Sequence, residues 1–246
     1  MRRVFDVLLA AVGLVILSPV LLPAMLFVWL QDFHSPFYLA PRVGRNGKPF
    51  RMVKLRSMVA NADRTGVDST SAQDPRITPV GRFIRRYKLD EVMQLCNVLT
   101  GDMLLVGPRP NVKRETDLYT EVERELLSAE PGVTDFASIV FADEGEILKD
   151  APDPDIAYNQ VIRPWKSRLG LFYIERRSPA LDIRLLCLTA LAIVDRERAL
   201  RGVAQLLQQL GADPALCRIA LRQDRLMPVP PPGSTEVVTT RQATSS

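Results

Sequence analysis

The sequence predicts a mainly α-helical protein with one short β-hairpin, and three observations support this. A long apolar segment with a proline break opens the chain, two short extended runs flank Asn46-Gly47, and most of the remainder carries helix start and stop signals. Of the 246 residues 47% are hydrophobic, and the net charge is +4. These values exclude global disorder and allow one large domain or two small ones.

The composition also excludes several kinds of site. There is one histidine, His34, and the three cysteines Cys96, Cys187 and Cys217 show no CxxC spacing. Zinc sites and disulfide scaffolds are therefore not expected, and we expect the cysteines to act as small buried hydrophobes. The absence of GxxxxGK[ST] and GxGxxG argues against P-loop and Rossmann chemistry. The modest charge, without a recognised motif, argues against nucleic-acid binding.

The apolar segment over residues 5–30 contains one charged residue, Asp6. Its length would cross a bilayer core of about 30 Å as a straight helix. However, Ser18 and Pro19 fall in the middle, and Pro23 follows within about one turn. A proline removes a backbone donor and clashes with the preceding turn, so we expect the helix to bend or break there. The Ser18 hydroxyl is placed to bond a carbonyl that the break frees.

Three interpretations of this segment remain open: a cleaved signal peptide, a kinked transmembrane helix, and a re-entrant hairpin that enters and leaves on one side. The segment is long for a signal peptide and lacks a convincing cleavage site. Basic residues precede it, at Arg2 and Arg3, and also follow it, between Arg42 and Arg56. Positive residues on both sides favour a re-entrant hairpin with both termini in the cytoplasm.

Local signals predict the elements that follow. FYLAPRV and FRMVKL around Asn-Gly indicate a β-hairpin, and the polar residues 59–79 indicate a loop. We expect a short basic helix over 80–89 and another from Asp90 to a C-terminal cap at Gly101. In chain order, we further expect helices over 111–128, an irregular acidic segment over 130–156, a buried or interfacial apolar helix over 179–194, a helical pair over 197–226 and a disordered tail from Met227.

Two adjacent carboxylates, Asp90 and Glu91, are candidates for catalysis. Acidic residues at a helix start are also common for a purely structural reason, because they complement the helix dipole. Four cations, however, stand just before them: Arg82, Arg85, Arg86 and Lys88. Cations and helix amides attract phosphate, and paired carboxylates beside phosphate suit Mg²⁺. An aspartate can also attack phosphorus and form an acyl-phosphate.

Arg109 and Lys54 are candidate phosphate ligands. Arg109 stands between two prolines in GPRP, so its backbone is stiff and extended. Such a backbone suits a guanidinium that contacts phosphate through two hydrogen bonds, although a rigid loop with a solvated arginine would look the same. Lys54 lies in the second hairpin strand, and considered alone this position favours a solvent-facing lysine over a phosphate ligand.

The order of these features resembles the bacterial sugar transferase family, the monotopic polyprenyl-phosphate phosphoglycosyltransferases. The resemblance rests on RVGRNGKPFRMVKLRSM, LDEVMQLCNVLTGDMLLVGPRP, PGVTDFA and SPALDIRLLCLTAL, and covers about residues 1–195. It implies a membrane-embedded re-entrant helix-break-helix, with amphipathic interfacial helices around a small cytosolic catalytic core. It also implies an enzyme of the cytoplasmic face of the bacterial inner membrane, which transfers a phospho-sugar from a nucleotide-sugar, typically a UDP-sugar, to undecaprenyl phosphate.

The resemblance also assigns expected roles to individual residues. Asp90 matches the nucleophile that takes the phospho-sugar as a covalent intermediate, and Glu91 matches its partner at Mg²⁺. Positions associated with phosphate or substrate binding are matched by Lys54, Arg85 and Arg109. A late acidic position of the active site is matched by Asp182. Ser18 and Pro19 match the motif that breaks the re-entrant helix.

The chain departs from the family pattern at Asp135 and Phe136, which replace Gly and Trp, and these changes leave the sugar unidentified. We expect the compact form of the family, divided into a membrane hairpin (1–33), a catalytic domain (34–195) and a helical extension with a tail (196–246). Homo-oligomerisation is left open. The alternative is a non-catalytic membrane adaptor with a basic face that binds anionic lipid or a partner.

Overall fold

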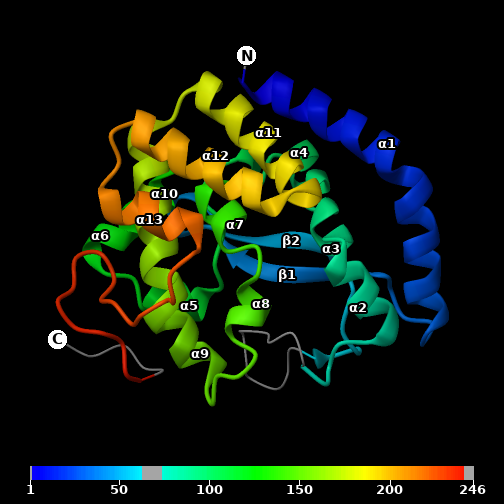
Figure 1. Cartoon of the computed structure of the whole chain (residues 1–246). Coiled ribbons are helices and arrows are strands. Elements are labelled where there is room, and N and C mark those ends of the chain that lie inside the picture. The colour runs from blue at the N-terminus through cyan, green and yellow to red at the C-terminus, as the bar shows by residue number, and fades with distance from the viewer. Residues whose placement is uncertain (1, 63–73, 241–246) are drawn as a thin grey trace.

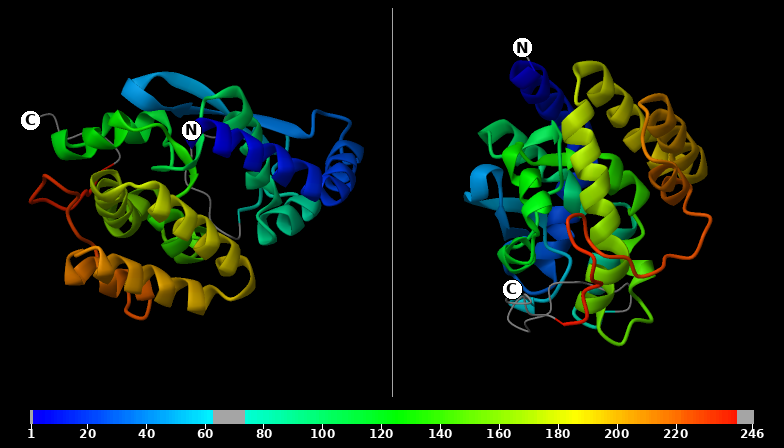
Figure 2. Two further views of the ribbon diagram at one scale, coloured as in Figure 1. Left: turned by 90° about the horizontal axis from the view of Figure 1, so that it is seen from above. Right: turned by 90° about the vertical axis from the view of Figure 1, so that its left-hand side faces the viewer.

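The computed structural model describes residues 2–62 and 74–240, and it is mainly helical with a short antiparallel hairpin, as predicted (Figure 1). The greater part of the predicted loop over 59–79 lies outside the described residues. Long helices form one side of the molecule, the hairpin crosses its centre, and the N-terminal helix runs along the opposite edge (Figures 1 and 2).

The N-terminal apolar segment forms one helix, α1 (Arg2–Leu30), which bends partway along its length (Figure 1). Pro19 has no N–H to donate to the carbonyl of Val15, and the Ser18 hydroxyl donates to that carbonyl instead, at 2.7 Å. The predicted bend and its serine partner are therefore present. By length and composition α1 could cross a membrane.

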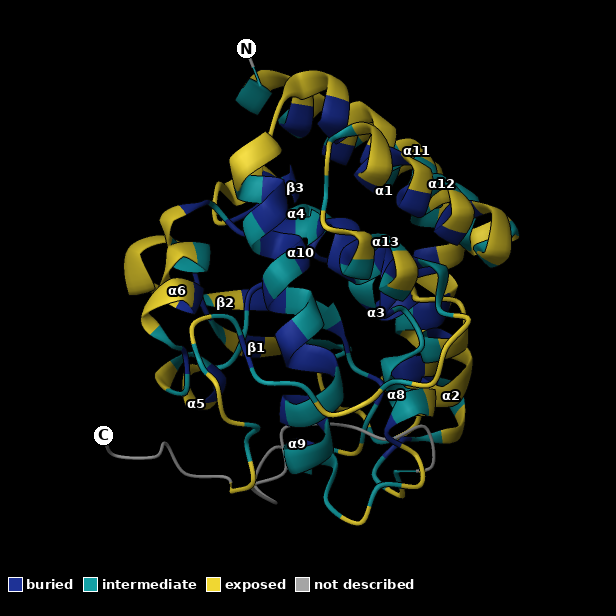
Figure 3. Ribbon diagram, turned by 60° about the vertical axis from the view of Figure 1, so that its left-hand side comes forward, coloured by how far each residue is buried: buried dark blue, intermediate teal, exposed yellow. Residues whose placement is uncertain are grey.

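Most of the surface of α1 is apolar and exposed (Figure 3). Val15 and Ile16 are 72% and 68% exposed, whereas Leu21, Ala24 and Val28 pack against the body. At its start, Arg2 donates to the carbonyl of Val106. The helix therefore uses one narrow side to attach to the protein and presents the rest to its surroundings.

Two strands, β1 (Phe37–Val43) and β2 (Pro49–Leu55), form the antiparallel hairpin. Asn46 and Gly47 both adopt positive φ in the connecting turn, which is the conformation that Asn-Gly favours. The amide of Asn97 donates to the carbonyl of Arg51 and its oxygen accepts from the N–H of Val53. These two bonds fix the second strand against the helices that follow.

The basic helix is α2 (Pro79–Arg86), and the helix expected from Asp90 to Gly101 is instead divided into α3 (Leu89–Val92) and α4 (Leu95–Thr100). No proline or glycine marks this division. Gly101, with φ of 102°, caps the second piece as predicted. Because α3 has only four residues, it offers little of a helix dipole, so any anion site here depends on side chains.

A second pair of strands, β3 (Leu104–Val106) and β4 (Gly132–Thr134), is parallel and was not predicted. The backbones of Gly107 and Gly132 cross beside it. A Cβ on Gly132 would lie 2.0 Å from the nitrogen of Gly107, so no side chain fits there. This crossing anchors the loop that follows Gly107.

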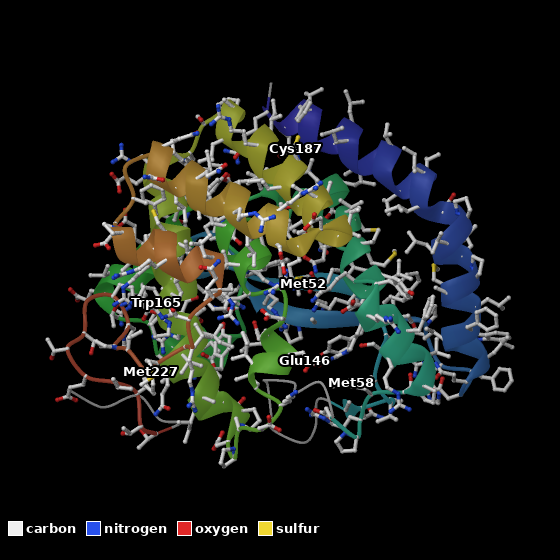
Figure 4. The ribbon with its side chains drawn as sticks, in the orientation of Figure 1. Met52, Met58, Glu146, Trp165, Cys187 and Met227 are labelled. Carbon is white, nitrogen blue, oxygen red and sulfur yellow. The ribbon has the colours of Figure 1, made fainter. Side chains whose placement is uncertain are left out.

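The remaining helices, apart from α5, α6 and η3, contribute to the largest apolar core together with the start of α1, the hairpin, α4 and the parallel strands. In chain order they are α5 (Lys113–Asp117), α6 (Glu121–Arg124), η3 (Glu125–Ser128), α7 (Phe136–Val140), α8 (Glu144–Ile147), α9 (Pro154–Ala157), η4 (Tyr158–Ile162), α10 (Arg163–Arg176), α11 (Pro179–Val194), α12 (Arg196–Gln209) and α13 (Pro214–Leu221). The predicted apolar helix and the predicted pair after it correspond to α11, α12 and α13. Cys187 is exposed on the outer side of α11, contrary to the expectation of burial (Figure 4).

The tail was expected to be disordered, but its described part, residues 227–240, follows a defined path over α6, η4 and α10. The N–H of Val229 donates to the carbonyl of Gln160, and the carbonyl of Pro230 accepts from Arg168. Trp165 and Met227 line a shallow pocket on this side (Figure 4). Prolines lack donors but keep their carbonyls, and here side-chain donors of the body bind those carbonyls.

Candidate active site

Asp90 and Glu91 occupy the second and third positions of α3, and the residue just before this helix has unusual backbone geometry. Lys88 has a φ of 56°, which turns the chain sharply between α2 and α3. Asp90 is 8% exposed, and its Oδ1 accepts no hydrogen bond from the residues that the structure describes. An unpaired buried carboxylate oxygen is costly for stability, which points to a ligand or a reaction at this atom.

Three cations act on the Asp90 carboxylate. Burial raises its pKa, and Lys54, Arg85 and Lys88 act against that rise. Lys54 extends from β2, and burial lowers the pKa of its ammonium to about 8 against the attraction of Glu91 and Asp90. The hairpin and the α2–α3 turn thus bring the predicted lysine to the predicted carboxylates.

Glu91 forms an ion pair with Arg109. The Nη2 of Arg109 lies 2.5 Å from Oε1 of Glu91, and Nη1 lies 3.4 Å from Oε2. Burial alone would raise the pKa of Glu91, but Arg109 and Lys54 outweigh it and hold it at about 2. Glu91 is therefore ionised at any physiological pH, and Arg109 holds both of its oxygens from one side.

Arg85 contacts Ser57 rather than a carboxylate directly. Its Nε donates to the serine hydroxyl at 2.8 Å, and its guanidinium is attracted by Asp90 and Asp74. Arg86, the next residue, is exposed and lies over the ring of Tyr87. The structure therefore includes Arg85 in the cluster and turns Arg86 away from it.

A further group of charged residues lies near Arg109, and the sequence alone did not identify it. Burial lowers the pKa of Arg109, but the attraction of Glu91, Glu144 and Asp135 outweighs burial and raises this pKa above its usual value. Glu144 pairs with Lys166 of α10, and Asp135 accepts hydrogen bonds from the N–H and hydroxyl of Ser138. Arg109, Asp135 and Lys166 line one pocket together with Tyr158. In the sequence, the one signal for this group was Asp135, which stands where the family pattern has Gly.

Asp182 is not brought to this cluster. It lies in the first turn of α11, where it accepts a hydrogen bond from Tyr173 at 2.6 Å and forms an ion pair with Arg2 at 3.0 Å. In this structure it joins α11 to the start of α1. Ser18 and Pro19 lie at the bend of α1, as described above.

The carboxylates fit Mg²⁺ by their chemistry. Mg²⁺ in phosphate-transferring sites is usually bound by one or two carboxylates, with phosphate oxygens and water as the other ligands. Asp90 and Glu91 supply this donor set, and Oδ1 of Asp90 is unpaired among the described residues. No group of three or more Asp, Glu, His or Cys that could hold a metal occurs in residues 2–62 and 74–240. The phosphates of a substrate would therefore be needed to complete the coordination.

The chain is similar to known proteins over most of its length. Residues 1–196 match the family model described as bacterial sugar transferase. An uncharacterized sugar transferase, EpsL, of Bacillus subtilis is 32% identical over 80% of this chain and 89% of its own length. The UDP-glucose:undecaprenyl-phosphate glucose-1-phosphate transferase of Caulobacter vibrioides is 36% identical over 67% of this chain and 64% of its own. The undecaprenyl-phosphate galactose phosphotransferase of Salmonella typhimurium is 40% identical over 54% and 31%. The chain thus spans less than two thirds of the last two.

Proposed function

Because the chain belongs to the bacterial sugar transferase family, we propose that it is a phosphoglycosyltransferase that moves a phospho-sugar from a UDP-sugar to undecaprenyl phosphate. Relatives whose names state an activity carry out this kind of transfer on undecaprenyl phosphate. One observation supports the proposal most directly. The Oδ1 of Asp90 is buried and unpaired among three cations, as a nucleophile toward phosphate requires.

In the first half-reaction, a carboxylate oxygen of Asp90 attacks the phosphorus that carries the sugar. A bond forms between that oxygen and phosphorus, and the bond from phosphorus to the bridging oxygen breaks. UMP leaves with the electron pair of the broken bond. Lys54 and Arg85 are placed to stabilise the charge that spreads over the phosphoryl oxygens, which is the main catalytic requirement in such transfers.

In the second half-reaction, an oxygen of undecaprenyl phosphate attacks the same phosphorus. The aspartyl–phosphorus bond breaks, the Asp90 carboxylate is regenerated, and the product is an undecaprenyl diphosphate-linked sugar. Glu91 and Asp90 would hold Mg²⁺, which when bound would neutralise charge on the diphosphate oxygens. Arg109 keeps Glu91 ionised and oriented throughout.

We also propose that α1 is a re-entrant anchor that places this site at the cytoplasmic face of the bacterial inner membrane. Its exposed surface is almost entirely apolar, and both of its ends are joined to the same body. At one end Arg3 donates to the carbonyl of Met103, and at the other Arg56 pairs with Asp32. Labelling of cysteines placed at residues 5 and 31 tests this, since both should react from the cytoplasm; labelling from opposite sides would indicate a spanning helix.

The enzymatic proposal is tested by UMP release from a panel of UDP-sugars with purified protein, Mg²⁺ and undecaprenyl phosphate. We expect release with one of these sugars and a loss of at least about a thousandfold in Asp90→Asn, because the amide cannot attack phosphorus. Asp117→Asn, at an exposed carboxylate of α5, is the matched control and should retain full activity. Full turnover of Asp90→Asn would exclude the covalent route. Absence of release with every sugar, together with membrane detachment when basic residues are removed, would support the adaptor instead.

A further inference from the structure

Helices α12 and α13 lie almost entirely beyond the part of the chain that matches the family, yet they pack on the same core as the site. Residues 197–246 fall outside the family match. Ala199, Leu207 and Ala220 are fully buried in the common core. In Figures 1 and 2 both helices lie on the side of α7 and α10, away from the C-terminal half of α1. This extension is therefore an integral part of the folded body.

Two arginines, Arg196 at the last matched position and Arg222 in the extension, converge on one carboxylate in the segment between α7 and α8. Arg196 and Arg222 lie 2.8 Å and 3.4 Å from the oxygens of Asp143. The guanidinium of Arg222 also lies over the ring of Phe141, at 5.3 Å from its centroid. The side chain of Arg222 is 11% exposed, so this contact is largely shielded from water and from salt.

The same segment reaches the active site through its other atoms. Residues 141–144 are called the bridge segment below. The carbonyl of Ala142 accepts a hydrogen bond from Nζ of Lys88 at 2.9 Å. Glu144 pairs with Lys166 and acts electrostatically on Arg109. The bridge segment therefore contacts Lys88, which acts on Asp90, and it acts electrostatically on Arg109, which pairs with Glu91.

Lys88 connects the bridge segment to the Asp90 carboxylate. It stands two residues before Asp90, acts on the Asp90 carboxylate, and forms the left-handed turn that starts α3. Its long side chain is exposed and has many rotamers, so the Ala142 carbonyl restricts where its charge lies. A shift of about 1 Å in such a group can cost a large factor in rate.

We propose that Arg222 is a positioning residue of the transferase, which acts through Asp143 and the bridge segment on Lys88 and thereby on Asp90. Arg196 assists it from the start of α12. The C-terminal extension thus holds the cation beside the nucleophile in place, which assigns it a role in the reaction itself. The inference rests on the proposed function for its kinetic consequence and on geometry alone for the contact.

The kinetic experiment compares Arg222→Gln with Arg218→Gln, an exposed arginine of α13, the helix that ends just before Arg222. We expect kcat/KM for UMP release to fall about tenfold in the first variant and to stay within twofold of wild type in the second. Asp143→Asn, which removes the charge from the other partner with little change in size, should match Arg222→Gln. Arg222→Lys should recover part of the loss, because it restores a positive charge near Asp143.

A second background separates positioning from loss of fold. In Lys88→Met the group that Arg222 acts on is absent, so adding Arg222→Gln should change kcat/KM by less than twofold. A role confined to stability would lower activity by the same factor in both backgrounds. Either that result, or an Arg222→Gln or Asp143→Asn variant with wild-type activity, would overturn the inference.

Hydrogen exchange tests the contact without the reaction. Backbone amides of residues 88–91 and of the bridge segment should exchange several-fold faster in Arg222→Gln than in wild type, and unchanged in Arg218→Gln. Equal protection of residues 88–91 in all three proteins would contradict the inference even if UMP is released. A wild-type protein that releases no UMP but shows the exchange difference would contradict only the proposed function.

Discussion

Two arginine–carboxylate pairs in this protein, one fully buried and one half-buried, have the same chemistry and different roles. Glu123 and Arg163, between α6 and α10, are 0% and 1% exposed. Each Glu123 oxygen has two donors: Oε1 accepts from Arg163 Nε and the Ser167 hydroxyl, and Oε2 accepts from Arg163 Nη2 and the N–H of Thr120. Every acceptor position of Glu123 is thus used within the protein.

The Glu91–Arg109 pair is satisfied only in part. Arg109 approaches Glu91 with one short and one long contact, and the adjacent Asp90 leaves Oδ1 unpaired. Lys54 acts electrostatically on both carboxylates and does not pair with the free oxygen of Asp90. A network that uses all its atoms holds the fold together, whereas one that keeps an atom unpaired beside cations is prepared for a substrate.

The largest effect on folding should come from breaking the Glu123–Arg163 pair, in which every carboxylate oxygen is fully hydrogen-bonded. Arg163→Met leaves the buried Glu123 charge without its partner, so we expect a loss of about 3–5 kcal/mol in the free energy of unfolding. For a chain of this size the midpoint of thermal unfolding should fall by roughly 10 °C. Asp90→Asn, by contrast, removes a poorly paired buried charge and should leave the midpoint unchanged or higher. An equal loss in both variants would remove the distinction between the two sites.

The next effect concerns the Glu91–Arg109 pair and the planar geometry of its guanidinium. Arg109→Lys keeps the charge but loses the planar fork that contacts both Glu91 oxygens, and we expect kcat/KM to fall about 10–100-fold with little change in unfolding temperature. Arg198→Lys, at an exposed surface pair, is the control and should be silent. Wild-type kinetics in Arg109→Lys would mean that charge alone suffices at this position.

The smallest effect is expected at a third pair, Arg56 and Asp32, which is partly exposed. Hydrogen bonds from Arg56 hold the pKa of Asp32 at about 2, below its usual 3.8. The pair therefore stabilises the fold above about pH 4, and this contribution is lost as the pH falls toward 2. Arg56→Gln should cost less than about 1 kcal/mol at pH 7, and its unfolding midpoint should approach that of wild type as the pH is lowered. A difference that is constant from pH 7 to pH 3 would contradict this assignment.

Much of the fold was predictable because its signals are local. Asn46-Gly47 determines the hairpin turn, Gly101 ends α4, and Pro19 bends α1 with Ser18 at the freed carbonyl. The parallel pair β3–β4 was missed because strands of three residues show no periodicity. The division between α3 and α4 carries no breaker residue and follows from tertiary packing.

The candidate site was predictable where residues follow one another and less so where distant segments meet. Asp90 and Glu91 are adjacent in sequence, and Lys54, Arg85 and Arg109 do gather around them. Asp182 was expected there and instead pairs with Arg2. Lys166 and Glu144 were not expected, because they are distant in sequence and meet only in the ion pair that brings the Glu144 charge near Arg109.

The crossing of Gly107 and Gly132 has a consequence for engineering this protein. Arg109 stands two residues after Gly107, where a side chain would collide with the backbone near Gly132. Exchange of either glycine would therefore shift the loop backbone and displace the Arg109 guanidinium. A library intended to alter the choice of sugar in the proposed reaction should therefore hold both glycines fixed. Its variation belongs around Lys166, which lines the same pocket as Arg109, whereas the buried Asp135 caps α7 through Ser138 and should also be kept.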